Sequence, residues 1–223
     1  MDKVFHEFKQ VLNYFEPISY LDIGVCKGHA IPFILDMLPS LKIIEMIEAN
    51  RLHEPELQIL SKEKNIPFYI EVLSDSIKEI EFYLASLDPS STGPGNSYYK
   101  ENTFHYTNSI IEKRMTNTLD NIYKDKNISF DLVKMDTQGS ELDIIKGGKK
   151  LLQNTKAFIL EENMLGNFNI NAPTHHDIKS YLSKIKYTWI CFLDEKQRHI
   201  SDQNGNDMLL HEVDSLYINN KYL

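Results

Sequence analysis

Short apolar runs alternate with amphipathic stretches along most of the chain. Apolar runs that end in polar or glycine-bearing turns predict strands at 18–23, 42–47, 66–73, 130–135, 156–160, 188–193 and 208–218. Between them, apolar residues at helical spacing predict helices at 30–38, 54–64, 118–123, 140–152 and 176–185. Such alternation implies right-handed crossovers between parallel strands, so we expect an α/β fold with a mostly parallel sheet and helices on both faces.

The alternation lapses once, over residues 77–115. This stretch holds an additional predicted strand at 80–84, a turn-rich loop at 88–96 and a polar, aromatic segment. We interpret 77–115 as an insertion over the strand-end face, covering either a substrate or a cofactor; a plain surface loop is the alternative. The apolar spacing of the first residues predicts an N-terminal helix over 1–16. No Gly- or Ser-rich linker divides the chain, so we expect one domain over 1–223.

Charge and composition restrict the class of protein. The 223 residues carry a formal net charge of -8 without a long basic run, which argues against an obligatory nucleic-acid partner. No run reaches the roughly 18 apolar residues that a membrane span needs, and the N-terminus is amphipathic rather than signal-like, so we expect a cytoplasmic protein. The two cysteines, Cys26 and Cys191, have no metal-binding spacing. The sequence leaves the oligomeric state open, with a homodimer as one option.

The first candidate site is the turn Asp22-x-Gly24-x-x-x-Gly28 after the first predicted strand. Glycines let a ligand approach the backbone closely, and a following helix offers free N–H donors. The spacing differs from the G-x-G-x-x-G dinucleotide pattern. An acid beside the turn repels a pyrophosphate and attracts a sulfonium, which favours S-adenosylmethionine (SAM) over NAD. A tight strand–helix turn without a ligand is the alternative.

Two further strand ends carry polar residues that suit a nucleoside. Glu48 ends the second predicted strand, where an acid can accept hydrogen bonds from both ribose hydroxyls. Ser74 and Asp75 follow the third strand and would meet the adenine edge. The alternatives are a solvated carboxylate at Glu48 and an Asx-type turn at Asp75.

The chain resembles the FkbM-type SAM-dependent methyltransferases from about residue 18 to its end. The resemblance rests on Asp22-Ile-Gly-x-x-x-Gly28, Glu48-Ala49-Asn50, Leu73-Ser74-Asp75 and, above all, the segment from Asp131 to Gly147. It implies a class I methyltransferase fold: a Rossmann-like sheet of seven strands, mostly parallel, whose last strand, here 208–218, is antiparallel. It also implies O-methylation, often of sugars or of glycosylated or lipid products.

The resemblance completes a set of expected cofactor contacts. These are Asp22, Gly24, Val25, Gly28, Glu48, Ala49, Ser74, Asp75 and Asp136. Val25-Cys26 stand where the family commonly has Ala-Asn, and Gln138 and Ser140 stand where Glu and Ala are frequent. These departures bear on the contacts to the methionine end of SAM more than on ribose binding.

The acceptor hydroxyl needs a general base or a metal ion, because a neutral hydroxyl is a poor nucleophile. Asp136, at the end of the fourth predicted strand, is our first candidate; it would position the acceptor, bind a metal or contact the sulfonium, and capping of the turn at Gly139 is the alternative. His175 or His176, at the start of a helix that Thr174 would cap, is a second candidate base, with an ordinary surface position as the alternative.

A metal site is a further hypothesis. The run Glu161-Glu162-Asn163 follows the fifth predicted strand, and with Asp136 it resembles the metal site of catechol-type O-methyltransferases. Asp136, Glu162 and Asn163 would then bind Mg²⁺ through oxygen atoms. The alternative is that Glu161 or Glu162 borders the acceptor pocket, with Glu162 among the catalytic residues.

The sequence therefore favours a SAM-dependent O-methyltransferase acting on a small-molecule or glycan acceptor. The alternative is a catalytically inactive module of the same fold that binds a partner or supports an assembly. The acids at Asp22, Glu48 and Asp136 argue for the enzyme.

Overall fold

A computed structural model describes residues 15–85 and 95–223 of the chain. The predicted helix over 1–16 and most of the predicted loop at 88–96 lie outside the described residues. No helix within the described ranges is long and apolar enough to cross a membrane.

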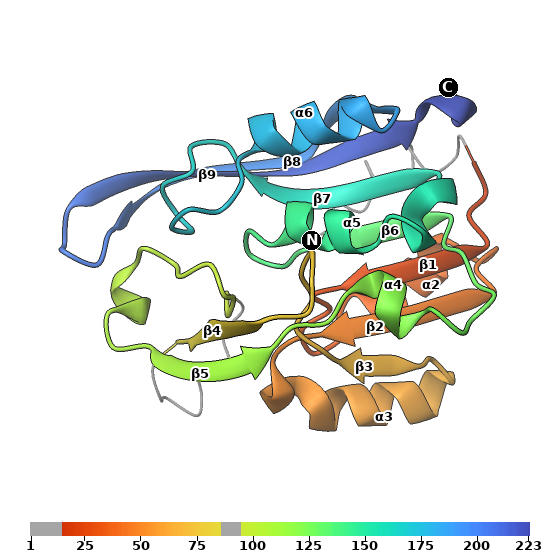
Figure 1. Ribbon diagram of the computed structural model, residues 1–223, viewed down its shortest axis with the longest axis horizontal. Helices are drawn as coiled ribbons and strands as arrows, with labels where there is room; N and C mark the ends of the chain where they lie inside the picture. The colour runs from red at the N-terminus through yellow and green to blue at the C-terminus, as the bar shows by residue number, and fades with distance from the viewer. Residues whose placement is uncertain (1–14, 86–94) are drawn as a thin grey trace.

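A seven-stranded sheet in the order β3-β2-β1-β6-β7-β9-β8 forms the centre of the molecule (Figure 1). Its strands are β1 (Ser19–Ile23), β2 (Ile43–Glu48), β3 (Phe68–Ile70), β6 (Leu132–Met135), β7 (Ala157–Asn163), β8 (Tyr187–Ser201) and β9 (Asp207–Asn219). The first five pair in parallel, and β9 runs antiparallel to both β7 and β8. The expected α/β fold with an antiparallel last strand is confirmed.

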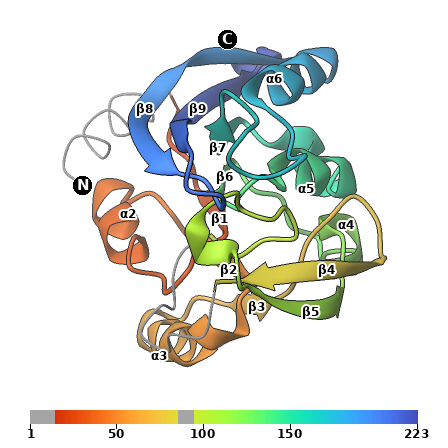
Figure 2. The same cartoon turned by 90° about the vertical axis from the view of Figure 1, so that its left-hand side faces the viewer.

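Helices cover both faces of this sheet, as the end view in Figure 2 shows. Helices α2 (Ile31–Met37) and α3 (Glu54–Lys64) lie on one face, where their apolar residues join the cluster around Tyr20 and Leu132. Helices α4 (Leu119–Ile122), α5 (Glu141–Gly147) and α6 (His175–Lys184) lie on the other, against the cluster around Leu21 and Val133. Neighbouring residues of one strand therefore pack into the cores on opposite faces of the sheet, because side chains alternate along a strand.

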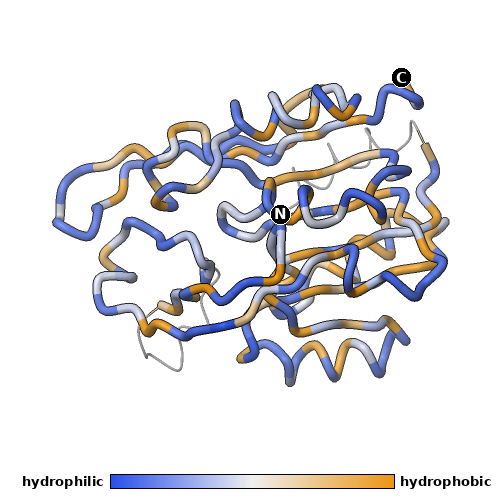
Figure 3. Tube along the Cα trace, in the orientation of Figure 1, coloured by the Kyte–Doolittle hydropathy of each residue, from blue (hydrophilic) through white to orange (hydrophobic). Residues whose placement is uncertain are grey.

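The interior strands read as nearly continuous apolar runs because both of their faces are covered (Figure 3). Tyr20, Leu21, Leu132 and Val133 are fully buried. Burying one large apolar side chain contributes about 1.5–3 kcal/mol, so these strands hold the sheet together.

Strand order reverses between β1 and β6, because β1 leads to β2 on one side and β6 leads to β7 on the other. In open α/β sheets a crevice forms at such a switch point, outside the carboxyl ends of the strands. The first glycine turn follows β1 and the Asp136 turn follows β6, so the fold brings both to this crevice.

Several elements differ in length from their predicted ranges. The strand predicted at 66–73 is limited to β3, and the helix predicted at 140–152 ends at Gly147, followed by the 3₁₀ helix η3 (Leu151–Asn154). A side chain at Gly147 would lie 2.1 Å from the Ser74 carbonyl oxygen, which shows how closely α5 packs there. In the other direction, β7 continues through Asn163 and β8 through Ser201, because β9 pairs with both along their length.

The 77–115 segment forms a second, two-stranded sheet at the carboxyl ends of the parallel strands. Its strands β4 (Glu79–Leu84) and β5 (Ile110–Met115) are antiparallel, and only β4 was expected. The remaining short helices are η1 (Arg51–His53), η2 (Phe104–Tyr106) and η4 (Asn220–Tyr222). The segment after residue 95 crosses toward the long β8–β9 hairpin, where Phe168, Met208 and Leu210 form a small third core.

Candidate active site

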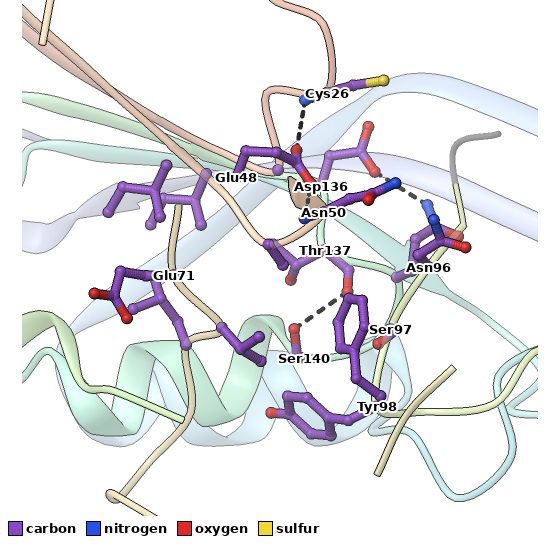
Figure 4. A pocket seen from close by; sticks show the side chains of 18 of the residues that line it. Cys26, Glu48, Asn50, Glu71, Asn96, Ser97, Tyr98, Asp136, Thr137 and Ser140 are labelled. Carbon is purple, nitrogen blue, oxygen red and sulfur yellow. Dashed lines mark hydrogen bonds between the residues drawn. The ribbon is translucent and has the colours of Figure 1, made fainter. Parts of the chain in front are cut away.

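A first cavity lies at the switch point, between the ends of β1, β2 and β6 and the 77–115 segment (Figure 4). With its open mouth included, this space measures about 680 Å³. Its apolar wall includes Ile47, Val72, Leu73, Phe82 and Ile144, and its polar wall includes Glu48, Asn50, Asn96, Ser97, Asp136, Gln138 and Ser140.

The two glycines of the first turn have different tasks. Gly24 borders the cavity at φ +81°, and a side chain there would lie 1.8 Å from the Asp136 carbonyl oxygen. Gly24 is therefore required for the close approach of the β1 and β6 turns. Gly28, at φ +74°, faces Leu60 of α3 instead, and it is not among the residues that line the cavity.

Glu48 ends β2 and is fixed by backbone donors. Its Oε2 accepts a hydrogen bond from the Cys26 N–H, and its Oε1 accepts one from the Asn50 N–H, both at 2.7 Å. The side chain is buried and borders the first cavity together with Ala49. Each carboxylate oxygen retains a lone pair for a further donor, so Glu48 can accept hydrogen bonds from a diol.

Asp136, which follows β6, belongs to a cluster of charged groups on one face of the sheet. Gln138 Nε2 donates to Asp136 Oδ1 at 3.1 Å and to Glu161 Oε2 at 2.6 Å, so one amide bridges two carboxyl groups. Lys134 Nζ lies 3.4 Å from Asp136 Oδ2. The turn itself is closed by Glu141, whose Oε1 accepts hydrogen bonds from the Thr137 N–H and hydroxyl. Asp136 is thus free of the capping role considered as its alternative.

The pKa values of the two bridged carboxyl groups are shifted in opposite directions. Burial, followed by the charge of Asp136, raises the pKa of Glu161 well above its ordinary value. Burial acts on Asp136 in the same direction, but the Lys134 ammonium and hydrogen bonds with Glu161 and Gln138 together lower its pKa. Of the two groups, Glu161 therefore binds a proton more readily, and Asp136 favours the ionised form.

A second cavity lies on the other side of Asp136 and Gln138, which line both spaces. It opens between the β8–β9 hairpin and the segment that carries η2. Its walls are formed by Glu101, Thr103, Phe104, His105, Glu161, Phe168, Lys196, Arg198, Ile200, Ser201 and Glu212. The mixture of aromatic rings with donors and acceptors suits a polar ligand that also has an apolar face.

Glu162 and His175 form a separate buried cluster on the opposite face of the sheet. Glu162 Oε2 lies 2.7 Å from His175 Nδ1, and its Oε1 accepts a hydrogen bond from the Tyr217 hydroxyl at 2.8 Å. Neither residue lines either cavity. His176 is exposed in the first turn of α6, and Thr174 caps that helix, as expected, in a capping box with Asp177.

The three residues considered as magnesium ligands do not converge. Adjacent strand residues point to opposite faces, so Glu162 is directed away from Asp136 and toward His175. Asn163 Nδ2 donates to Asn169 Oδ1 at 3.0 Å. Within 15–85 and 95–223, no group of three His, Cys, Asp or Glu side chains is arranged to hold a metal ion. Asp136, Glu162 and Asn163 therefore do not fit a Mg²⁺ site.

The remaining expected cofactor contacts lie beside the first cavity rather than in its wall. Asp22 is buried on β1, where its Oδ2 accepts a hydrogen bond from the Tyr20 hydroxyl while its Oδ1 has no hydrogen-bond partner among the described residues. Val25 packs in the core with α2. Ser74 is fully buried, and Asp75 accepts hydrogen bonds from Ser74, Ser76 and Lys78, as in a polar turn.

Some polar residues at these cavities were not singled out from the sequence for a role there. Gln138 bridges the carboxyl pair from a backbone with φ +56°, and its departure from the family pattern was the one available signal. Glu161 was not distinguished from Glu162 as a residue bordering an acceptor pocket, although alternation along β7 separates the two. His53 was not among the candidate residues, yet it is buried and borders the first cavity.

Comparison with known families agrees with this architecture. Residues 22–188 match the model of the methyltransferase FkbM domain, which is well over half of the chain. The chain belongs to the FkbM methyltransferase family. The match includes the Gly24 turn, Glu48 and the Asp136 turn, although the match alone does not assign a role to any of them. No curated protein matches the sequence.

Solved structures share the fold at low sequence identity. The methyltransferase FkbM from Methylobacillus flagellatus is 14% identical with a TM-score of 0.54, over 91% of this chain and 44% of that one. The YcgJ protein from Bacillus subtilis is 9% identical with a TM-score of 0.53, over 98% and 99% of the two chains. A putative RNA methyltransferase from Pyrococcus horikoshii is 8% identical with a TM-score of 0.50, over 97% and 80%. This chain thus spans less than half of the Methylobacillus protein.

Proposed function

We propose that this methyltransferase is a SAM-dependent O-methyltransferase that binds the nucleoside part of SAM in the first cavity and its acceptor in the second. The observation that carries the proposal is the shared wall: Asp136 and Gln138 border both cavities, at the carboxyl end of β6. When a group is transferred between two bound molecules, the reacting atoms have to approach to about 3–3.5 Å, so the two binding sites must share a border.

The first cavity has hydrogen-bond acceptors and apolar residues that suit a nucleoside. Glu48 presents two carboxylate oxygens held by backbone N–H groups, which suits the two ribose hydroxyls. The apolar residues that follow β2 and β3, including Val72 and Leu73, suit the faces of adenine. The close packing of Gly24 against the Asp136 carbonyl keeps this side of the cavity free of a side chain.

The charge at the shared wall suits a sulfonium. Asp136, whose pKa is lowered, lines the cavity together with the carboxyl group of Glu48. SAM, when bound, supplies a methyl group on a sulfonium and so carries the reactive chemistry itself. A dinucleotide pyrophosphate would be repelled by the same charges.

On the acceptor side, the chain must receive one proton. We assign this task to an Oδ of Asp136, which accepts the proton of the acceptor hydroxyl as its oxygen gains the methyl group. Gln138 holds the Asp136 carboxylate in place, and the raised pKa of Glu161 limits the repulsion between the two neighbouring carboxyl groups. The extra proton then leaves to water through the second cavity.

The second cavity supports a hydroxylated acceptor, either a small molecule or a glycan. Phe104 and Phe168 offer apolar faces, while Lys196 and Arg198 offer donors. Sugars combine apolar ring faces with hydroxyl groups, and the FkbM resemblance points to the same class.

Calorimetric titration with SAM tests the proposal, with NAD as a second ligand. We expect micromolar SAM binding without NAD binding, and a SAM affinity at least about tenfold weaker in Glu48→Gln, because a neutral amide accepts fewer hydrogen bonds from a diol. Glu63→Gln, an exposed substitution on α3, is the matched control and should bind like the wild type. Absence of SAM binding, or equal affinities in the two variants, would contradict the proposal.

A further inference from the structure

Cys26 lies at the first cavity, in the turn that follows β1. It has a left-handed backbone with φ +54°, and its N–H is the donor that fixes Glu48. The side chain is half-buried and borders the cavity, as Figure 4 shows beside Glu48. The mechanism above uses only the backbone of Cys26, which leaves its sulfur without a task.

His53, from η1, is packed against this sulfur. Its Nε2 lies 3.9 Å from Cys26 Sγ, and its Nδ1 lies 3.8 Å from Glu48 Oε1, an ion-pair distance that is too long for a hydrogen bond. The side chain is 2% exposed, borders the same cavity, and its Nδ1 has no hydrogen-bond partner among the described residues. Sulfur, imidazole and carboxylate thus lie in sequence along one wall.

The surroundings favour a cationic imidazole. Burial opposes the charge, but Cys26 and Glu48 outweigh it and raise the pKa of His53 to about 10. The other charged groups nearby are Glu56 of α3 and Lys27, whose side chains pair with each other at 3.4 Å. An imidazolium beside a cysteine stabilises the anionic form of the sulfur, which is the nucleophilic form.

We propose that Cys26 and His53 form a reactive cysteine–histidine pair, and that Cys26 is a modification site for small soft electrophiles, of which hydrogen peroxide is the oxidant we assign. The sulfur attacks one peroxide oxygen, an S–O bond forms and the O–O bond breaks. The sulfur loses two electrons and the peroxide gains them. The departing hydroxide takes the His53 proton and leaves as water, so Cys26 becomes a sulfenic acid.

The added oxygen occupies the wall beside Glu48, so oxidation of Cys26 should hinder SAM. This consequence rests on the proposed function, whereas the reactivity of the sulfur does not. Cys191 provides a comparison within the chain, because it lies on β8 against the core formed with α2 and lines neither cavity.

Alkylation kinetics test the reactive pair. The full chain carrying Cys191→Ser is treated with iodoacetamide at pH 7, and the adduct is followed by intact mass. We expect Cys26 to react at least about tenfold faster in the native protein than in urea, because an ordinary cysteine is only a few per cent thiolate at pH 7. Adding His53→Gln should remove the acceleration. A native rate equal to or below the unfolded rate would overturn the proposal, and this comparison does not depend on the folding of any His53 variant.

Peroxide treatment tests the consequence. After hydrogen peroxide, dimedone should label Cys26, and SAM titration should show an affinity at least about tenfold weaker, restored by dithiothreitol. A protein with both cysteines replaced by serine should keep whatever SAM affinity it had before treatment. Unchanged SAM affinity in the oxidised protein would overturn the consequence. Absence of SAM binding in the untreated protein would instead contradict the proposed function and leave the alkylation result standing.

Discussion

Two neighbouring glutamates of β7 lie in contrasting environments. Glu161 faces the charged cluster beside the second cavity, where Gln138 bridges it to Asp136. Glu162 faces the helix α6 side, where His175 and Tyr217 occupy both of its oxygens. Two adjacent residues of one strand therefore carry a carboxyl group that borders a cavity and one that is enclosed and fully paired.

The difference shows how one strand can serve both chemistry and stability. On the Glu162 side both oxygens of the carboxyl group have close partners, and the aromatic rings of Trp189 and Phe192 pack around His175. On the Glu161 side several acids surround the half-buried Lys134, whose pKa they raise although burial would lower it, and Lys196 lies near the same acids. Unbalanced charge of this kind is costly without a ligand and is typical of functional sites.

Removing one carboxyl group at a time should separate the two regions most strongly. Glu162→Ala removes the carboxylate partner of both His175 and Tyr217 in a buried cluster, so we expect the free energy of unfolding to fall by about 3 kcal/mol. Glu161→Ala removes a half-buried acid whose pKa is raised, and its cost should be below about 1 kcal/mol. Urea denaturation at pH 7 measures both, and equal losses would break the comparison.

On the cavity side, Glu101 should make the free energy of unfolding depend on pH. Burial raises the pKa of Glu101 from its ordinary 4.5 to about 7. The folded protein then binds more protons than the unfolded chain between about pH 4.5 and 7, so this residue's contribution to stability falls as the pH rises through that window. Glu101→Gln removes the dependence and should be about 2 kcal/mol more stable than wild type at pH 8, with little difference at pH 4. A variant that is less stable than wild type at pH 8 would contradict this sign.

The charge of Asp136 should appear in the choice between SAM and S-adenosylhomocysteine, which lacks the sulfonium charge. Asp136→Asn should reduce the preference for SAM over S-adenosylhomocysteine by about tenfold, because the attraction to the cation is lost. Glu162→Gln is the matched control on the other face and should leave the ratio unchanged. Calorimetry with both ligands gives the ratio for each variant, and an equal shift in both variants would mean that the cluster around Asp136 has no special relation to the sulfonium.

The smallest expected effect is that of the Tyr217 hydroxyl. Tyr217→Phe removes one hydrogen bond to Glu162 within a buried network and should lower the free energy of unfolding by about 1 kcal/mol. Tyr222→Phe, at an exposed position near the C-terminus, should stay within about 0.5 kcal/mol of wild type. If thermal denaturation shows no difference between them, the enclosed network contributes less than its geometry implies.

The order of strands and helices could be predicted because apolar periodicity and turn residues are local signals. The helix at 54–64 was predicted with its observed bounds, and Glu48 and Asp136 were placed at strand ends that do meet at one crevice. The partition of Glu161 from Glu162 was not predicted, because the strand was taken to end at residue 160, although it continues to Asn163 by pairing with β9.

Contacts between distant segments were beyond the reach of local patterns. The bridge from Gln138 to Glu161 and the approach of His53 to Cys26 depend on how strands and turns assemble. The strand β5 was missed because most of its residues are polar or exposed, and its partner β4 provides the pairing. The resemblance to the FkbM family added the expected sheet, which the structure confirms, and an acceptor class, which stays a prediction.

A crystal structure with S-adenosylhomocysteine tests the central claim most directly. The account predicts the ligand in the first cavity, with both ribose hydroxyls bound to Glu48 and the sulfur directed toward Asp136 and the second cavity. A ligand bound elsewhere, or one whose sulfur is directed away from Asp136, would contradict the assignment of the two cavities and of the carboxyl pair between them.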